Sequence, residues 1–205
     1  MPTGQAVPPP QGFKMLCLRD PSECSGGTNA PRRLTLTRQR SQELEAVNAY
    51  VNGFPETTDE ANYNQIEYWT AADRVRGGDC EDLALEKRKL LVERGWPEED
   101  LLLATVTTAP GESHVVLIAV TDQGELVLDN KNWAVIPWGY APFTWEKRQS
   151  RERPAVWVEL NPNRFTGEAL KLPPLDQRGS AVATAAKPLP PGEAATSGLG
   201  TSITP

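Results

Sequence analysis

The stretch from Gly77 to Glu86, GGDCEDLALE, constrains the fold of this chain more than any other. Glycine permits backbone angles that are closed to other residues, so the glycine pair indicates a tight turn. Asp79 after the turn is a good helix N-cap, and Asp82 stands where a capping box places its acidic partner. We therefore predict a helix from about residue 79 to residue 94, with Cys80 as its first residue.

A cysteine at this position has two interpretations. The unpaired N–H groups and the positive dipole end of a helix favour a thiolate, which makes Cys80 a candidate nucleophile. The alternative is a small buried residue near a helix start, because most free cysteines are inert. The remaining sequence has to decide between the two.

Composition indicates one folded domain with flanking segments. The chain has 205 residues, of which 39% are apolar and 19 are proline, too many prolines for uniform packing. Residues 1–11 are predicted to be a disordered Pro-rich leader, 12–161 the folded domain, and 162–205 a disordered tail rich in Pro, Ala, Gly and Ser. The net charge of -6 argues against nucleic acid as the main partner, and no apolar run is long enough to span a bilayer.

Helical and strand-like patterns occur in two successive blocks. Helical periodicity is found over residues 31–54 and again after Cys80. Segments 101–108, 113–121 and 125–129 are instead rich in Val, Ile, Leu and Thr and are separated by turn residues. This order predicts an α+β fold, with N-terminal helices packed on one side of an antiparallel β-sheet.

Two of the three cysteines are close together in the sequence. Cys17 and Cys24 could close a short disulfide loop, which would imply an oxidising compartment and leave Cys80 as the odd thiol. A zinc pair is the rival interpretation, but the spacing is not C-x2-C and no second pair is available. The first eleven residues have neither a basic residue nor an apolar core, so they do not form a secretory signal. The protein is therefore either cytosolic or has had its signal removed.

His114, which heads an apolar strand, is the single histidine of the chain, and Asp129 ends the following strand. Each has an ordinary alternative interpretation. His114 could be a histidine at a strand end whose ring finds a backbone partner, and Asp129 could be a turn former. If the two strands pair as a hairpin, the two side chains lie near opposite each other. A thiolate nucleophile needs a base, and that base needs a group that fixes its tautomer. Cys80, His114 and Asp129 are therefore a candidate catalytic triad.

Four segments together resemble the bacterial transglutaminase-like cysteine proteinase family. They are the Asp-Cys-Glu-Asp box, the upstream Tyr68-Trp69 pair, Ser-His-Val-Val-Leu around His114, and Leu-Asp-Asn around Asp129. The resemblance covers about residues 12–160 and implies a papain-like core. It also implies that Cys80 is the nucleophile, that His114 acts first as general base and then as acid, and that Asp129 orients the imidazole.

The characterised relatives are calcium-dependent periplasmic proteases that cut large surface adhesins. The resemblance thus implies a periplasmic monomer with a cell-surface protein as substrate and Ca²⁺ as cofactor, and Asp79 and Glu81 match the ligands. Asp82 is a further candidate. Carboxylate oxygens suit Ca²⁺, and a bound cation would neutralise acids that otherwise raise the pKa of the cysteine. Alternatively, Glu81 and Asp82 are simply first-turn acids that the helix dipole favours.

The predicted chemistry is acyl transfer, in which the Cys80 thiolate attacks an amide carbonyl and water hydrolyses the resulting thioester. The backbone N–H of Cys80 is the expected oxyanion donor, with help from the segment that contains Trp69, although Trp69 as plain core is an equal alternative. Transglutamination, in which an amine replaces water, is the alternative reaction. A catalytically silent cell-envelope binding module is the alternative that is not an enzyme, and the complete triad weighs against it.

Overall fold

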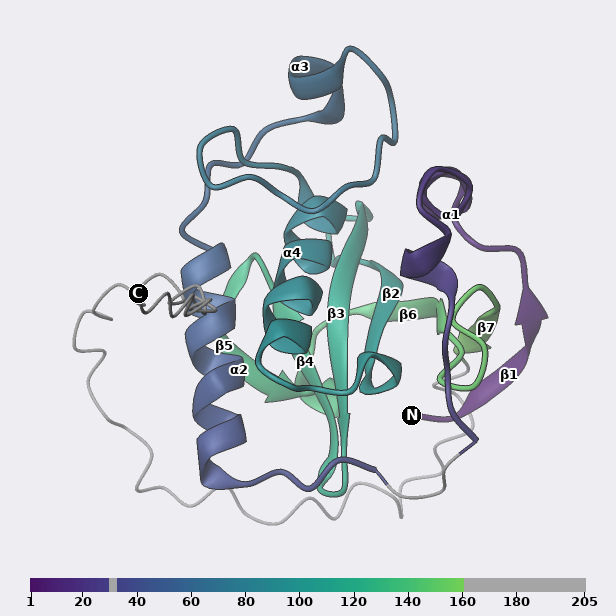
Figure 1. The fold of residues 1–205 in the computed structure, drawn as a ribbon, viewed down its shortest axis with the longest axis vertical. Helices are drawn as coiled ribbons and strands as arrows, with labels where there is room; N and C mark the ends of the chain where they lie inside the picture. Colours follow the sequence, from purple (N-terminus) through teal and green to yellow (C-terminus); the bar gives the residue numbers. More distant parts are fainter. Residues whose placement is uncertain (30–32, 161–205) are drawn as a thin grey trace, which may run out of the picture.

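The computed structural model describes residues 1–29 and 33–160 (Figure 1). Its helices are α1 (Gln11–Arg19), α2 (Arg38–Val51), α3 (Asp59–Tyr63) and α4 (Cys80–Glu93), with short 3-10 turns η1 (Pro21–Cys24), η2 (Glu98–Asp100) and η3 (Trp138–Tyr140). Its strands are β1 (Thr3–Val7), β2 (Leu101–Thr107), β3 (Ser113–Thr121), β4 (Gly124–Asp129), β5 (Asn132–Pro137), β6 (Thr144–Gln149) and β7 (Trp157–Leu160). The predicted tail, residues 162–205, lies outside the described residues. No helix in the described ranges is long and apolar enough to cross a membrane.

The seven strands form one antiparallel sheet with the order β1-β7-β6-β2-β3-β4-β5. Helix α4 packs on β3 and β2, and α2 packs beside it on β5 and β4 (Figure 1). The prediction of an α+β fold with helices packed on an antiparallel sheet is therefore confirmed.

The central strands are buried on both faces. Alternate residues of β2 and β3, such as Leu103 and Leu117, belong to the main core that also contains the helices. The residues between them, such as Leu102 and Ile118, belong to a second core on the opposite face. Since successive strand side chains point to opposite faces, covering both faces explains why β3 is almost continuously apolar.

Strand β1 corrects the sequence prediction for the N-terminus. Residues 1–11 were expected to be a disordered leader, but Thr3–Val7 pairs with β7 and Gln11 begins α1. The Lys147 ammonium also donates a hydrogen bond of 3.0 Å to the carbonyl of Pro8. An edge strand is held by backbone hydrogen bonds, which composition does not report. The prolines lie outside the strand, Pro2 before it and Pro8 to Pro10 after it, where no ladder N–H is needed.

The disulfide prediction is confirmed. Cys17 of α1 and Cys24 of η1 are bonded, with their Cα atoms 5.5 Å apart, and Cys80 is the free cysteine.

Helix α2 begins where a cap is available, since the Thr37 hydroxyl accepts a hydrogen bond of 3.2 Å from the Arg40 N–H.

The turn into α4 depends on Gly77. This residue has a φ of +76°, and a Cβ atom there would lie 1.9 Å from the carbonyl oxygen of Pro55. The next N–H, of Gly78, donates to that same oxygen at 3.2 Å, and the Gly78 carbonyl accepts from Thr57 at 3.2 Å. The chain that leads into α4 is thus clamped against the segment that follows α2.

We expect Gly77→Ala to lower the free energy of unfolding by about 2–4 kcal/mol, because alanine adds both left-handed strain and a backbone clash. Gly95→Ala is the matched control, since Gly95 has a φ of +81° with no atom within 4 Å of the added Cβ. It should cost only about 1 kcal/mol, the strain alone. Urea unfolding measures the free energy of unfolding that each variant loses. Equal losses in the two variants would show that the clash with Pro55 does not contribute.

Candidate active site

A cavity of about 350 Å³ lies at the N-terminal end of α4. Cys80, the first residue of α4, and His114, near the start of β3, both line it. The structure therefore brings the predicted nucleophile and base to one cavity, although the residues are far apart in sequence. The tight Gly77 turn and the packing of α4 on β3 produce this arrangement.

His114 and Asp129 are joined by a hydrogen bond of 2.8 Å between Nε2 and Oδ1. The hairpin of β3 and β4 places them there, because Leu117 pairs with Leu128, which makes Asp129 a diagonal neighbour of His114. An ionised carboxylate only accepts hydrogen bonds, so Nε2 carries the proton. This leaves Nδ1 as the basic nitrogen of a neutral ring.

The environment of Asp129 keeps its carboxyl group ionised. Burial by itself raises the pKa of Asp129, but the hydrogen bond from His114 and one of 3.0 Å from the Lys131 N–H outweigh it, so the pKa is lower than usual. Asn52, the C-cap residue of α2, donates a further hydrogen bond of 2.9 Å to the backbone carbonyl of Asp129. The carboxylate can therefore hold the imidazole in one orientation and one tautomer.

The Cys80 thiol has a less favourable environment than a helix N-terminus alone would provide. Burial raises the pKa of Cys80 far above its ordinary value, and the charges of Glu81 and Asp79 raise it further, opposed only by a hydrogen bond from the Val115 N–H. The sulfur donates a hydrogen bond of 3.1 Å to Glu81 Oε2. The sequence argument for a thiolate rests on the helix dipole, but burial of the thiol and, after it, the charges of the flanking acids raise the pKa of Cys80.

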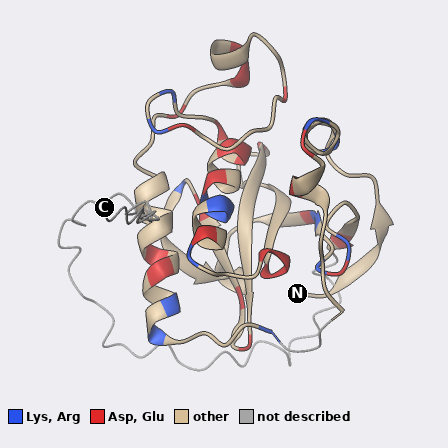
Figure 2. Ribbon diagram, viewed as in Figure 1, with Lys and Arg blue, Asp and Glu red and all other residues tan. Residues whose placement is uncertain are grey.

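Acidic residues occur in α3, in the loop that follows it and in the first turn of α4 (Figure 2). Carboxylate oxygens of Asp59, Asp79 and Glu81 all lie within 4.8 Å of one another. Burial is the main cause that raises the pKa of all three, and that of Asp79 reaches about 8. Buried oxygens of Asp59 and Asp79 have no hydrogen-bond partner among the described residues. Buried, unsatisfied, mutually repelling carboxylates of this kind fit a hard divalent cation.

Asp59 is the member of this cluster that the sequence did not indicate. It follows Thr58, whose hydroxyl caps α3, so it resembles an ordinary solvated acid in a first turn. In the folded chain it is buried, and its carboxylate accepts a hydrogen bond from the Tyr68 N–H. A short polar helix gives no local signal of such burial.

Asp82 does not form the capping box that the sequence predicts. Asp79 is the N-cap residue of α4 but makes no side-chain capping bond, so the predicted capping box is absent. Asp82 lies outside the three-acid cluster. Its Oδ1 accepts a hydrogen bond of 2.8 Å from the Thr70 N–H, and its backbone carbonyl accepts one of 3.1 Å from Ala72. The side chain is used to bind the segment before α4, which a local capping rule does not anticipate.

Trp69 is both a core residue and part of the cavity wall. Its ring is buried, lies edge-on to Phe13 with centroids 6.0 Å apart, and donates a hydrogen bond of 3.0 Å from Nε1 to Glu67.

The sequence did not indicate the charged residues of the cavity wall, which are Glu67, Glu146 and Lys147. Their sequence signal is that of ordinary surface residues.

The family model for the bacterial transglutaminase-like cysteine proteinases (BTLCP) matches residues 3–165. The chain belongs to this family. The papain-like, transglutaminase-like fold expected from the sequence is thereby confirmed, and the chain is a cysteine proteinase at the level of the family.

Among solved structures, the chain is similar to LapG of Legionella pneumophila. The calcium-bound LapG structure is 26% identical, with a TM-score of 0.48, over 57% of this chain and 67% of LapG. A further LapG structure is 24% identical, with a TM-score of 0.48, over 62% and 74% of the two chains. The EGTA-treated LapG structure is 23% identical, with a TM-score of 0.45, over 58% and 67%. No curated protein matches the sequence.

Proposed function

We propose that this protein is a cysteine peptidase that hydrolyses amide bonds of a protein substrate with Cys80, His114 and Asp129. The observation that carries the proposal is the hydrogen bond of 2.8 Å between His114 and Asp129, beside the cavity that both His114 and Cys80 line. Membership of a cysteine proteinase family supports the same reaction class. A nucleophile, a base and an orienting carboxylate are the parts that acyl transfer requires.

Each group has a defined task in the reaction. Nδ1 of His114 accepts the proton of the Cys80 thiol, and the thiolate attacks the substrate carbonyl carbon. The Cys80 backbone N–H, in the first turn of α4, donates to the oxyanion. Nδ1–H then protonates the leaving amine, which releases it and leaves a thioester. Water deprotonated by Nδ1 attacks the thioester carbonyl, and the acid product and the thiol are released.

The acid cluster is the proposed site for Ca²⁺, with Asp79, Glu81 and Asp59 as ligands. Oxygen donors alone, all from carboxylates, suit this hard cation. When bound, the ion supplies positive charge that offsets the acids on either side of the thiol. Asp59 additionally accepts from the Tyr68 N–H, so it also ties the segment that contains Trp69 to the cluster.

The proposed location is the periplasm, and the proposed substrate is a cell-surface protein. The bond between Cys17 and Cys24 supports an oxidising compartment, since structural disulfides persist there and are rare in the cytosol. The cell-surface substrate follows from the resemblance to adhesin-cleaving relatives.

A labelled-water experiment tests the proposed reaction. The protein, with Ca²⁺, is incubated with a diverse peptide library and a primary amine in H₂¹⁸O, and the products are analysed by mass spectrometry. We expect new carboxyl termini that each carry one ¹⁸O atom, because water resolves the thioester. Amine-substituted glutamine side chains would indicate transglutamination instead. An unchanged library would contradict both reactions and favour the silent binding module.

A further inference from the structure

Helix α1 holds Trp69, which forms part of the cavity wall, by its ring and by its backbone. Gly12, in the first turn of α1, lies directly against the indole, since a Cβ atom there would come within 2.2 Å of the ring. Phe13 packs edge-on against the same ring. At the other end of α1, the Arg19 guanidinium donates a hydrogen bond to the backbone carbonyl of Trp69. The wall therefore depends on a helix that carries none of the residues assigned to the reaction.

Arg19 makes a second contact with the same wall. Its guanidinium carbon lies 3.9 Å from the centroid of the Tyr68 ring, a cation–π contact. A planar guanidinium can stack on a ring and donate hydrogen bonds in its own plane at the same time, which an ammonium group cannot do. Arg19 is exposed, so these contacts do not serve to fill the core. An exposed side chain with two specific contacts to one short segment is suited to holding that segment in place.

The segment that contains Tyr68 and Trp69 belongs to no helix or strand, so no regular backbone ladder holds it. Its N–H groups are bonded to acids from neighbouring elements instead. The Tyr68 N–H donates to the Asp59 carboxylate, and the Thr70 N–H donates to Asp82 at 2.8 Å. The contacts of Arg19 add a carbonyl and a ring to these two N–H groups. The segment thus keeps its shape through side chains that reach it from outside.

Glu67 begins this segment with a strained backbone. Its φ is +57°, a left-handed conformation that residues other than glycine adopt at a cost. The Glu67 carboxylate lines the cavity and accepts the hydrogen bond of 3.0 Å from Nε1 of Trp69. Such a conformation persists only where the surrounding contacts impose it. The wall of the cavity is therefore a place where lost contacts would allow the backbone to relax.

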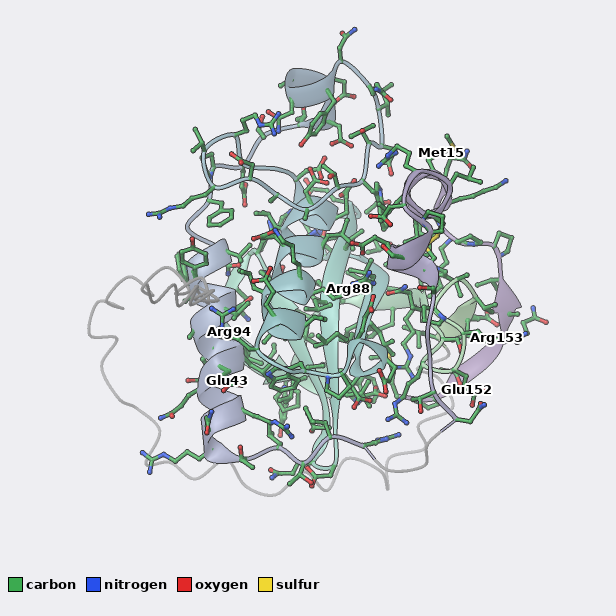
Figure 3. The ribbon with its side chains drawn as sticks, in the orientation of Figure 1. Met15, Glu43, Arg88, Arg94, Glu152 and Arg153 are labelled. Atoms are coloured by element: carbon green, nitrogen blue, oxygen red, sulfur yellow. A yellow bond between two sulfur atoms is a disulfide. The ribbon has the colours of Figure 1, made fainter. Side chains whose placement is uncertain are left out.

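The loop that carries Arg19 is itself anchored to α4. The disulfide closes residues 17–24 into a short loop, and Arg19 lies inside it. In the same loop, Glu23 forms an ion pair with Arg88 of α4, whose guanidinium also donates a hydrogen bond of 3.0 Å to the Glu23 carbonyl. Arg88, labelled in Figure 3, is only 3% exposed. The loop thus connects the helix that carries the candidate nucleophile to the cavity wall.

We propose that Arg19 is a positioning residue that fixes the segment of Tyr68 and Trp69 as a wall of the substrate-binding cavity. Its guanidinium holds the carbonyl and the ring in place, and the closed loop ties this constraint to α4. Because Trp69 and Cys80 line the same cavity, the position of the wall decides how a peptide binds beside the sulfur. The effect on the enzyme rests on the proposed function, whereas the constraint on the segment does not.

Arg40→Met is the matched control for Arg19→Met. The Arg40 guanidinium makes the same two kinds of contact, since it lies over the Trp96 ring at 5.9 Å and donates a hydrogen bond of 3.1 Å to the Thr35 carbonyl. Neither of these partners is among the residues that line the cavity. The two variants therefore lose equivalent contacts at different places in the fold.

Hydrogen exchange measures the constraint without any need for activity. Amide exchange is followed by NMR in the parent and in both variants, with Ca²⁺ present. In Arg19→Met, the Tyr68 and Thr70 amides should exchange about tenfold faster relative to the amides of β2, because the segment opens locally. In Arg40→Met this ratio should stay at the parent value. An arginine that only stabilises the fold would accelerate all these amides in parallel or leave them unchanged, and either result would overturn the proposal.

Kinetics on a peptide that the parent hydrolyses test the consequence for binding. Arg19→Met should raise KM about tenfold and change kcat by less than about twofold, because the wall binds the peptide while the reacting groups stay in place. Arg19→Lys can still donate to the carbonyl but cannot stack in the same way, so its KM should rise only about threefold. Arg40→Met should leave both constants unchanged.

The remaining outcomes separate this inference from the proposed function. Faster local exchange in Arg19→Met with an unchanged KM would show that the wall does not seat the substrate, which would overturn the positioning role. If Arg19→Met does not fold, Arg19→Lys decides by the same two measurements. A parent without activity would remove the peptidase proposal, and the exchange of the Tyr68 and Thr70 amides would still decide whether Arg19 holds the wall.

Discussion

Cys80→Ala is expected to reduce amide hydrolysis by at least about 10⁴-fold while leaving the fold intact. No other described residue offers a free thiol, because Cys17 and Cys24 are bonded to each other. Removing the sulfur removes the covalent step, and the remaining oxyanion donor and binding contacts give only residual catalysis. Peptide hydrolysis followed by mass spectrometry measures the loss, and circular dichroism checks the fold.

The control for this variant removes the other two sulfur atoms. The double variant Cys17→Ser, Cys24→Ser should be less stable than the parent, by about 2–4 kcal/mol, yet retain hydrolysis at temperatures where it is folded. An alkylating reagent should label the parent once, at Cys80, and block hydrolysis in proportion to labelling. Equal rates for the parent and Cys80→Ala would show that the reaction does not use this thiol.

Asp59→Asn is expected to weaken Ca²⁺ binding by about 100-fold or more, because it removes one of three clustered carboxylates. Isothermal titration calorimetry measures the affinity directly. In the parent, Ca²⁺ at about 100 times its Kd should add about 2.7 kcal/mol to the free energy of unfolding, and EGTA should reverse the gain. Mg²⁺, which dehydrates reluctantly and demands stricter geometry, should give a smaller gain.

Glu60→Gln is the matched control for the metal site. Glu60 is the next acid along α3 but is exposed, so its loss should change the affinity by no more than a fewfold, through long-range charge. Equal effects of the two variants would mean that general negative charge, not a defined site, attracts the ion. A parent that does not bind Ca²⁺ would exclude the metal site altogether.

Local features of the sequence were sufficient for the elements that carry the candidate triad. The turn at Gly77 and the start of α4 at Cys80 follow from backbone preferences within a few residues. The hairpin that joins His114 to Asp129 follows from two apolar strands and a short turn between them. The family resemblance used the same short segments, and the family match agrees with it.

Only the tertiary structure decided which polar groups are buried. Asp59, Asp82 and Lys87 look like ordinary charges of solvated helix positions, yet each is enclosed by segments distant in the sequence. Strand β1 is likewise held by pairing with β7, about 150 residues later, an interaction that leaves no local pattern. The sequence of this protein determined which chemistry its helix and hairpin can present. Long-range packing determined the electric environment in which that chemistry has to operate, because burial depends on every segment that covers a group and not on its neighbours in the chain.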